Sequence, residues 1–363
     1  MKITALKIYP LKNRMILINL LTDEGISGIG QLIGFSPKSQ IKYIEEVLKP
    51  IIINRNPLKI EKNWNEMYWK GYGKNGWIQA IAAIDIAMHD IYGKVKKKPL
   101  YKIFGKKKIK TNHKLYWSMG HGFEKTPKQM LKLVEMGWGL GFRAFKIRMD
   151  WHELKQDINP LKDYQMLKLI RKFLPKHVPL GFDVNGGYSV KVAIKQGIKF
   201  EDLGGISHFE EPVATYDLEG LKKVVDVLSL PVSFGEYEKT YWRFKEVLKI
   251  ANPDIIQPDI LNVGGFNQLK KVYELARKNK KLIFPHSPDI GVLSFASLHM
   301  YSTINSSIAH EYSPELYKFK TEKLKNLFNE DILPVNGKIK LNDKYGLGLT
   351  INKKFLKKNE LKN

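Results

Sequence analysis

Three acidic residues stand at the ends of three short apolar runs, and their spacing constrains the fold more than any other feature. The runs span 181–185, 208–212 and 234–236, and they carry Asp183, Glu210 and Glu236, which are 27 and 26 residues apart. Strands that each end in one acid at this period are typical of a βα barrel, which brings distant carboxylates to one rim. Three converging carboxylates suit a hard divalent cation, because such a cation prefers oxygen ligands.

Short apolar runs recur at the same spacing on both sides of the three acids. The series gives eight candidate strands, at 114–119, 144–148, 181–185, 208–212, 234–236, 255–259, 282–286 and 308–311. Six of these strands end in a polar residue that could serve a site, and the eighth also carries one: Arg148, Asp183, Glu210, Glu236, Asp259, His286 and Glu311. Between them lie segments such as 218–228 and 266–277, where apolar residues recur at helical spacing. A lone acid would be read as a turn residue or helix cap, but a series predicts a parallel barrel.

With these residues in place, the chain resembles the enolase superfamily, and within it the mandelate racemase subgroup of the mandelate racemase and muconate lactonizing enzyme family. Asp183, Glu210 and Glu236 match the metal ligands of that subgroup. His286 and Asp259 match its His–Asp dyad, and Glu311 matches the acid of the eighth strand that binds the substrate carboxylate. Residues 146–148 fall where the subgroup carries Lys-x-Lys. The resemblance covers nearly the whole chain and implies a (β/α)7β TIM-like barrel with an α+β capping domain.

The resemblance also implies a chemistry. Removing a proton beside a carboxylate creates a dianionic enediolate, which a divalent cation stabilises. Magnesium is the expected cofactor because the ligands are all oxygen, and manganese is also compatible. Lys146 would lend positive charge to the substrate carboxylate, and Glu311, protonated or sharing a proton, would donate to its opposite oxygen. His286 would exchange the proton, held in one tautomer by Asp259, and Asn185 is a further candidate for substrate binding.

Arg148 stands where the subgroup has the second lysine of Lys-x-Lys, and this difference favours dehydration over racemisation. A racemase with two-sided proton transfer needs a base on each face, and arginine stays protonated. One base, His286, suffices to remove the α-proton and return it to a leaving β-hydroxyl. We therefore predict a lyase that dehydrates a sugar acid to a 2-keto-3-deoxy acid. The alternatives are a racemase, epimerase or cycloisomerase at the same site, or a protein of another class, either a non-catalytic metal- and acid-binding barrel or a lysine-rich binding protein.

The chain is expected to form an α+β capping domain over 1–112, a catalytic barrel over 113–324 and a tail over 325–363 that returns to the capping domain. Strands are predicted at 3–9, 15–21 and 26–31, and helices at 39–48, 60–69 and 78–92, the last ending at Gly93. Residues 11–14 leave room only for a hairpin turn where the family has a mobile lid, so either another segment closes the site or the site stays more open. Residues 69–77 are the candidate replacement, and an ordinary helix-to-helix connection is the alternative interpretation of that segment. His89 is predicted to be structural, and His121 and His310 are candidates for minor substrate contacts.

Composition bounds the remaining possibilities. The net charge of +25 invites a nucleic-acid interpretation, but the excess is mostly lysine scattered along the chain, so we expect no nucleic-acid partner. The absence of cysteine excludes disulfides, thiol nucleophiles and cysteine-bound zinc. No apolar run reaches membrane-span length, and the residues from Met1 lack a signal-peptide core, so a cytoplasmic protein is expected. The expected partners are a small carboxylate substrate and further copies of the chain.

Overall fold

The computed structural model describes residues 1–11, 14–33, 36–71, 77–105, 109–151, 155–304, 306–313 and 326–361. Its amino-terminal part is an antiparallel sheet in the order β1-β2-β3, with β1 at Ile3–Pro10, β2 at Met15–Thr22 and β3 at Ser27–Ile33. β1 and β2 form the predicted hairpin, in which Leu11 N donates to Met15 O at 2.8 Å. Helical segments follow the sheet: α1 (Pro37–Tyr43), a π-helical stretch (Ile44–Leu48), α2 (Lys49–Ile52), α3 (Ile60–Lys70), α4 (Ile78–Val95) and α5 (Leu100–Phe104).

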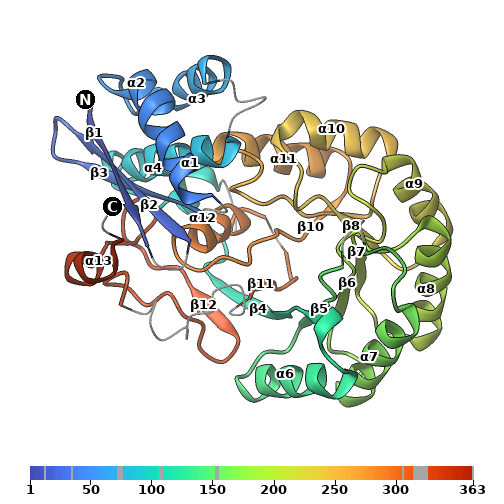
Figure 1. Cartoon of the computed structure of the whole chain (residues 1–363). Coiled ribbons are helices and arrows are strands. Elements are labelled where there is room, and N and C mark those ends of the chain that lie inside the picture. The colour runs from blue at the N-terminus through green and yellow to red at the C-terminus, as the bar shows by residue number, and fades with distance from the viewer. Residues whose placement is uncertain are drawn as a thin grey trace.

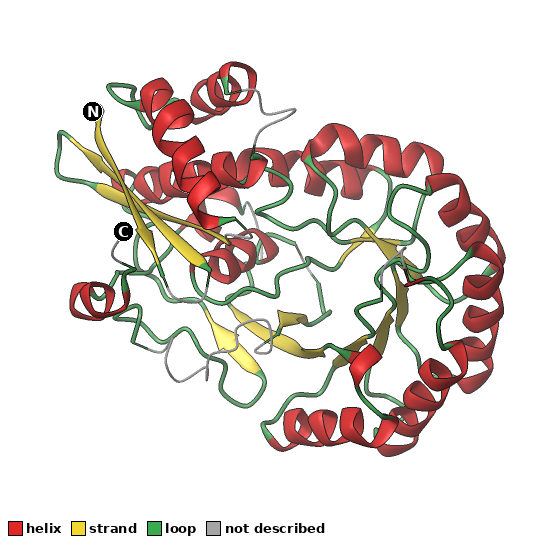
Figure 2. Cartoon of the chain, in the orientation of Figure 1, coloured by secondary structure: helices red, strands yellow, loops and turns green. Residues whose placement is uncertain are grey.

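The second part is a parallel barrel-like sheet wrapped by helices, as Figure 1 and Figure 2 show. All eight predicted strands form: β4 (Asn112–Met119), β5 (Phe145–Arg148), β6 (Leu180–Asp183), β7 (His208–Glu210), β8 (Val232–Phe234), β9 (Ile255–Ile256), β10 (Leu282–Ile283) and β11 (His310–Tyr312). Within the described residues, hydrogen bonding runs in the order β10-β9-β8-β7-β6-β5-β4-β11, without a β10–β11 pair. The predicted (β/α)7β architecture is therefore confirmed.

In the described part of the chain seven α-helices connect the eight strands, and several begin at the caps that their sequences provide. They are α6 (Pro127–Gly139), α7 (Pro160–Phe173), α8 (Val190–Leu203), α9 (Leu218–Val227), α10 (Thr240–Ile250), α11 (Phe266–Lys278) and α12 (Val292–Tyr301). Thr126 forms a capping box with Gln129 before α6, and the Asn159, Ser189 and Asp217 side chains accept from backbone N–H groups at the starts of α7, α8 and α9. Such side chains satisfy N–H groups that a helix leaves without internal partners.

Helix α4 contacts both parts of the molecule and packs between β3 and α11. It is apolar on nearly every face, as expected for a helix covered on both sides. Two glycines of β3 allow the close approach, because a Cβ at Gly28 or Gly30 would lie 2.0 or 1.9 Å from a carbonyl oxygen of α4. The prediction that this helix ends at Gly93 is wrong. α4 continues to Val95, and Gly93 is instead required because a Cβ there would lie 2.5 Å from Gly346 Cα.

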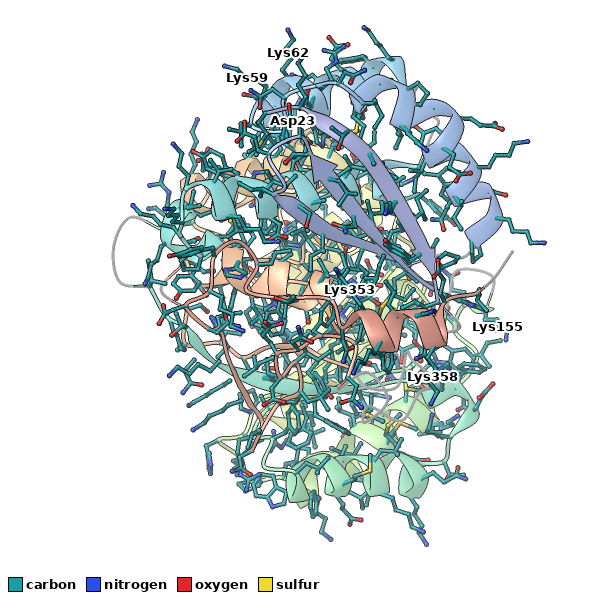
Figure 3. All side chains as sticks on the ribbon, turned by 90° about the vertical axis from the view of Figure 1, so that its left-hand side faces the viewer. Asp23, Lys59, Lys62, Lys155, Lys353 and Lys358 are labelled. Carbon is teal, nitrogen blue, oxygen red and sulfur yellow. The ribbon has the colours of Figure 1, made fainter. Side chains whose placement is uncertain are left out.

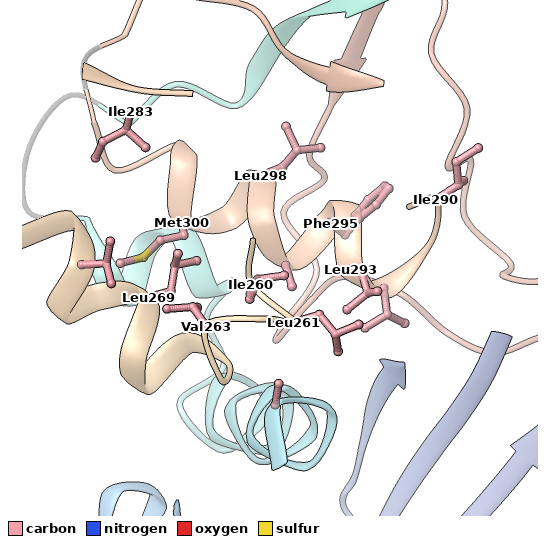
Figure 4. Close-up of a cluster of buried hydrophobic side chains, with 14 of the residues drawn as sticks. Ile260, Leu261, Val263, Leu269, Ile283, Ile290, Leu293, Phe295, Leu298 and Met300 are labelled. Atoms are coloured by element: carbon pink, nitrogen blue, oxygen red, sulfur yellow. The ribbon is translucent and has the colours of Figure 1, made fainter. Parts of the chain in front are cut away.

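Buried apolar residues continue from α4 into the loop after β9 and into α12. Figure 4 shows this cluster, in which Ile260, Leu261 and Val263 lie near Leu293 and Leu298 of α12. Polar contacts fix the same boundary: Trp64 Nε1 donates to Gly264 O at 2.7 Å, and Gln31 accepts from Val292 N at 2.9 Å. The capping part is thus held against the loops that follow β9 and β10.

The carboxyl-terminal tail contacts both parts of the molecule. β12 (Lys338–Lys340) pairs antiparallel with β4 and so extends the barrel sheet before the chain turns back. Beyond it, Leu347 N donates to Asp90 of α4 at 2.8 Å, and Leu361 N donates to Pro10 O at 2.8 Å after α13 (Lys353–Asn359). The tail therefore reaches the capping sheet by way of the barrel.

Candidate active site

Three buried carboxylates lie together at the carboxyl ends of β6, β7 and β8. One oxygen from each of Asp183, Glu210 and Glu236 lies within 4.8 Å of the others, and the three residues are 0%, 0% and 3% exposed. The strand register brings two of these carboxylates together, because Asp183 of β6 is paired directly with Glu210 of β7. Oxygen donors at such spacing can hold a divalent cation of the magnesium class. The sequence prediction that these three acids converge is confirmed.

Lys146 of β5 is the cation that the chain itself places among these acids. Its Nζ lies 2.6 Å from Glu210 Oε1, 3.2 Å from Glu311 Oε1 and 3.8 Å from Asp183 Oδ2. Burial alone would lower the pKa of Lys146, but the charges of Glu210 and Glu311 raise it well above its ordinary value. One ammonium group does not balance this many buried carboxylates, and burying unbalanced charge is costly. The excess of negative charge fits a site that also takes a metal cation.

The charges within this cluster shift the pKa values of Glu210 and Asp183 in opposite directions. For Glu210, burial favours the neutral form, but Lys146 outweighs it and lowers the pKa well below the ordinary value. For Asp183, burial and then the charge of Glu210 raise the pKa well above the ordinary value. Carboxylates this close cannot all ionise without a cation between them, so the protons that they bind and a metal ion compete for the site.

The pKa of Glu311 of β11 is lowered by its neighbours, whereas the sequence predicted a donor that is protonated or shares a proton when substrate is bound. Burial raises its pKa, but the positive charges of Lys146 and His286 outweigh burial and lower the pKa to about 2. Its Oε2 also accepts a hydrogen bond from Ser287 N at 2.8 Å, a contact that favours the charged form. The sequence correctly predicted its place in the cluster, whereas its charge depends on the distance to Lys146, which the sequence does not reveal.

His286 and Asp259 form the predicted dyad. His286 Nδ1 lies 2.9 Å from Asp259 Oδ2, while Oδ1 accepts from Leu261 N at 2.7 Å and Asn262 N at 3.0 Å. This arrangement favours a proton on Nδ1 and directs Nε2 toward Glu236 Oε2, 3.2 Å away. Burial lowers the pKa of His286, but Glu236 and Asp259 raise it more, to about 10. A cation on Glu236 would reduce that increase and bring the imidazole toward its basic form.

The other two predicted residues flank this cluster. Arg148 is in register with Asp183 across β5 and β6, and it follows Lys146 by two residues, so both side chains point to the same face of the strand. Its guanidinium lies against Gly120, where a Cβ would lie 2.2 Å from Arg148 Nη2. Asn185 donates from Nδ2 to Asp183 Oδ2 at 3.1 Å, and its Oδ1 accepts from Asp150 N at 3.0 Å. Asn185 therefore orients a carboxylate of the triad.

Three further residues belong to the site although sequence reasoning did not assign them. Gln257 Nε2 donates to Glu210 Oε2 at 2.6 Å, and His208 Nε2 lies 3.5 Å from the same oxygen. Glu211 is 1% exposed, and among the described residues neither of its carboxylate oxygens has a hydrogen-bond partner. Burial, and then the charges of Glu236 and Asp183, raise its pKa well above the ordinary value. Strand alternation would point Glu211 away from Glu210, but its φ of 40° ends the regular strand.

Several alternative site residues have other roles. His310, a candidate for a minor substrate contact, is buried and contacts Ser297 Oγ of α12 at 2.9 Å, and burial lowers its pKa to about 4. His89 lies 3.2 Å from Asp85 Oδ2 in α4, as expected of a structural residue. His121 is half-exposed and lies 4.0 Å from Asp150 Oδ2. The central part of the candidate lid, residues 72–76, lies outside the described residues.

The lysines labelled in Figure 3 lie at separate places on the molecule. Figure 3 shows Lys59 and Lys62 at one end of the molecule, and Lys155, Lys353 and Lys358 well away from them. A nucleic-acid surface would instead concentrate such residues along a continuous stripe. Among the described residues, no helix combines the length and the hydropathy needed to cross a membrane.

Comparison with known proteins agrees with this geometry. Residues 128–355 match the family model "Enolase C-terminal domain-like", and residues 9–105 match "Mandelate racemase / muconate lactonizing enzyme, N-terminal domain". The chain is 29% identical over 335 residues to an arabinonate dehydratase of Saccharolobus solfataricus, covering 91% of this chain and 86% of that protein. It is 28% identical over 359 residues to a D-galactonate dehydratase of Verminephrobacter eiseniae, covering 97% and 92%.

One similar solved structure is a complex with magnesium. A mandelate racemase/muconate lactonizing protein from Paracoccus denitrificans, complexed with magnesium, superimposes with a TM-score of 0.91 at 26% identity. The match covers 99% of this chain and 96% of that one. The fold of the chain thus has a counterpart in a protein that was crystallised with magnesium.

Proposed function

This chain belongs to the mandelate racemase / muconate lactonizing enzyme family of the enolase superfamily, and we propose that it dehydrates a sugar acid. The reaction removes the proton α to the carboxylate and expels the β-hydroxyl as water. The enol that results tautomerises to a 2-keto-3-deoxy acid. The observation that carries this proposal is the pairing of one His–Asp dyad, 2.9 Å apart, with an arginine where a second base would be needed.

In this proposal Asp183, Glu210 and Glu236 hold a divalent cation. Magnesium suits them because all three ligands are carboxylates, and manganese accepts the same donors. When bound, the cation supplies positive charge to the substrate carboxylate as negative charge develops there. Gln257 and Asn185 serve this function indirectly, since each donates a hydrogen bond to one carboxylate of the triad and fixes its orientation.

His286 is the proposed base and acid. The Nδ1 contact with Asp259 leaves Nε2 to accept the α-proton, and Asp259 is itself held by two backbone N–H groups. The protonated imidazole then returns its proton to the departing β-hydroxyl on the same face of the substrate. General catalysis of this kind contributes about 10²–10⁴-fold to a rate.

Lys146 and Glu311 are proposed to bind the substrate carboxylate, with Arg148 beside it. Lys146 is buried and positively charged, so it favours an anion in its neighbourhood. A carboxylate that approaches Glu311 brings a second negative charge, which would raise the pKa of Glu311 and allow a shared proton. Arg148 cannot serve as a base, because guanidinium stays protonated, but its planar fork suits a carboxylate or hydroxyl.

A screen of mono- and diacid sugars for 2-keto products, detected with semicarbazide, tests the proposal. The wild-type protein with magnesium should convert at least one sugar acid, while the variant His286→Asn and the EDTA-treated protein should not. Adding magnesium back should restore the treated sample. Conversion by His286→Asn at the wild-type rate would refute the assigned base, and epimerised substrate without a 2-keto product would refute dehydration.

A further inference from the structure

A second cavity lies at the opposite end of the barrel from the acidic triad. It has a volume of about 630 Å³ and is lined by residues at or just before the amino ends of β4, β5, β6, β7 and β11, and by the turn at 336–338. We call it the basal cavity and define it by Lys114, Arg143, His177, His208, Phe284 and Lys338. Its volume is in the range of small-molecule sites, which is about 300–1,000 Å³. Barrel enzymes keep their catalytic residues at the other end, so the proposed function does not account for this cavity.

The mouth of the basal cavity carries positive charge without compensating acids. No aspartate or glutamate is among its lining residues in the described part of the chain. Lys114 of β4 and Lys338 of β12 stand directly opposite each other in the antiparallel register. Like charges at such positions destabilise a strand pair, and neither lysine has an ion-pair partner among the described residues. An anion bound between the two would remove this repulsion.

Arg143 adds a fixed cation to the same mouth. Its Nη1 donates to Trp138 O at 2.9 Å and to Phe142 O at 2.7 Å, and its guanidinium lies 3.9 Å from the centre of the Trp138 ring. These contacts hold the group in place and leave its Nε and Nη2 donors for a ligand. A preorganised guanidinium is well suited to a carboxylate, which it can bind through two parallel hydrogen bonds.

The interior of the basal cavity is mostly apolar. Phe145, Val178 and Phe284 contribute to its walls, and the imidazole of His208 lies 5.2 Å from the Phe284 ring, centre to centre. Tyr116 also lines it, with a buried hydroxyl that has no partner among the described residues. A fully hydrated ion such as phosphate would not use these walls, whereas an aromatic or branched ligand would bury apolar surface against them.

We propose that the basal cavity binds a small organic acid with an apolar body. Its carboxylate lies between Lys114, Lys338 and Arg143, and its body contacts Phe145 and Phe284. The proposed contacts use neither the metal nor His286, and the acidic triad lies at the carboxyl ends of the strands, although His208 of the cavity lining also lies 3.5 Å from Glu210 Oε2.

Isothermal titration with three probes tests this site on the full chain. Benzoate combines charge and an apolar body, benzyl alcohol lacks the charge, and inorganic phosphate lacks the apolar body. The titrations use protein stripped of metal with EDTA, so that the acidic triad repels anions instead of attracting them. Benzoate should bind with about one equivalent per chain and at least about tenfold more tightly than either of the other probes, since only benzoate uses both features.

Two variants locate the binding. Replacing both lysines, Lys114→Gln with Lys338→Gln, should weaken benzoate about tenfold, as expected for two partly exposed charges. The same double variant should melt no lower than wild type, because a like-charged pair has been removed. Lys278→Gln, on an exposed part of α11, is the matched control and should bind benzoate as wild type does. Ala309→Phe, which fills the basal cavity, should abolish binding while circular dichroism remains unchanged.

The proposal is overturned if benzoate binds the double lysine variant or Ala309→Phe as tightly as wild type. It is also overturned if phosphate binds as well as benzoate, because scattered surface lysines would then explain the result. A lower melting temperature for the double variant would show that the lysine pair stabilises β12 by itself. None of these outcomes depends on dehydratase activity, so the basal cavity and the proposed function fail or succeed separately.

Discussion

Replacing Asp259 by asparagine should remove nearly all activity while leaving the fold and the metal site in place. The Oδ1 atom of Asp259 accepts from Leu261 N and Asn262 N, and an asparagine oxygen can keep both bonds. The new amide nitrogen then faces His286 Nδ1, which lies 2.9 Å from Oδ2 in the native protein. Because an amide nitrogen donates, Nδ1 must accept, and the imidazole proton moves to Nε2. The nitrogen that should take the α-proton is then already protonated.

The expected loss in kcat is about 10²–10⁴-fold, the full contribution of a general base, and a comparable tautomer change in a Ser-His-Asp enzyme costs about 10⁴-fold. Magnesium affinity should change little, because Asp259 is not among the three clustered carboxylates. Initial rates of 2-keto acid formation, measured with semicarbazide, give kcat, and titration calorimetry gives the metal affinity.

Asp254→Asn is the matched control. Asp254 precedes β9 and accepts from Val232 N at 2.9 Å, a bond that asparagine can also accept, so this variant should retain wild-type activity. The tautomer argument is refuted if Asp259→Asn keeps more than about a tenth of the wild-type kcat. It is equally refuted if the loss arises from a collapse of metal binding.

Three further predictions concern the metal, the pH dependence and the surface charge. Glu236→Gln should weaken magnesium binding by at least about tenfold, whereas Glu246→Gln on the exposed face of α10 should not, as calorimetry would show. The pKa of His286 is raised from 6.5 to about 10. Its stabilising contribution in the metal-free protein is therefore complete below pH 6.5 and is lost as the pH rises toward about 10. Melting temperatures should fall over this pH window in the wild-type protein, and should fall less in His286→Asn. A magnesium-saturated sample should show a smaller fall, and an equal fall would contradict the effect assigned to Glu236. Duplex DNA should bind weakly, without sequence preference, and lose binding at moderate salt in a filter assay; nanomolar binding to one sequence would contradict the scattered-lysine interpretation.

The barrel could be predicted from the sequence because each strand carries its own signal. A short apolar run recurs eight times, six of these runs end in a polar residue and the eighth also carries one, and this periodicity is a local property of the chain. The triad followed from the same signal, since parallel strands bring their carboxyl ends to one rim. The predicted end at Gly93 failed because glycine there serves a contact with Gly346, more than 250 positions away.

Other features of the site depend on geometry that no local pattern encodes. The lowered pKa of Glu311 follows from a distance of 3.2 Å to Lys146, and the burial of His310 follows from its contact with α12. Gln257 stands in a predicted strand two residues before Asp259, so alternation could have placed it on the same face as the dyad. Glu211 could not have been found in this way, because its backbone leaves the strand conformation.

Hydrogen exchange at the α-carbon tests the central claim most directly. The wild-type protein with magnesium is incubated in deuterated water with each of two sugar acids that differ only in configuration at the α-carbon, and proton NMR follows the α-proton. With His286 as the single base, only one of the two epimers should exchange or be dehydrated, and His286→Asn should stop both processes. Exchange of the α-proton from both epimers would show a second base on the opposite face and would make a racemase or epimerase the better assignment.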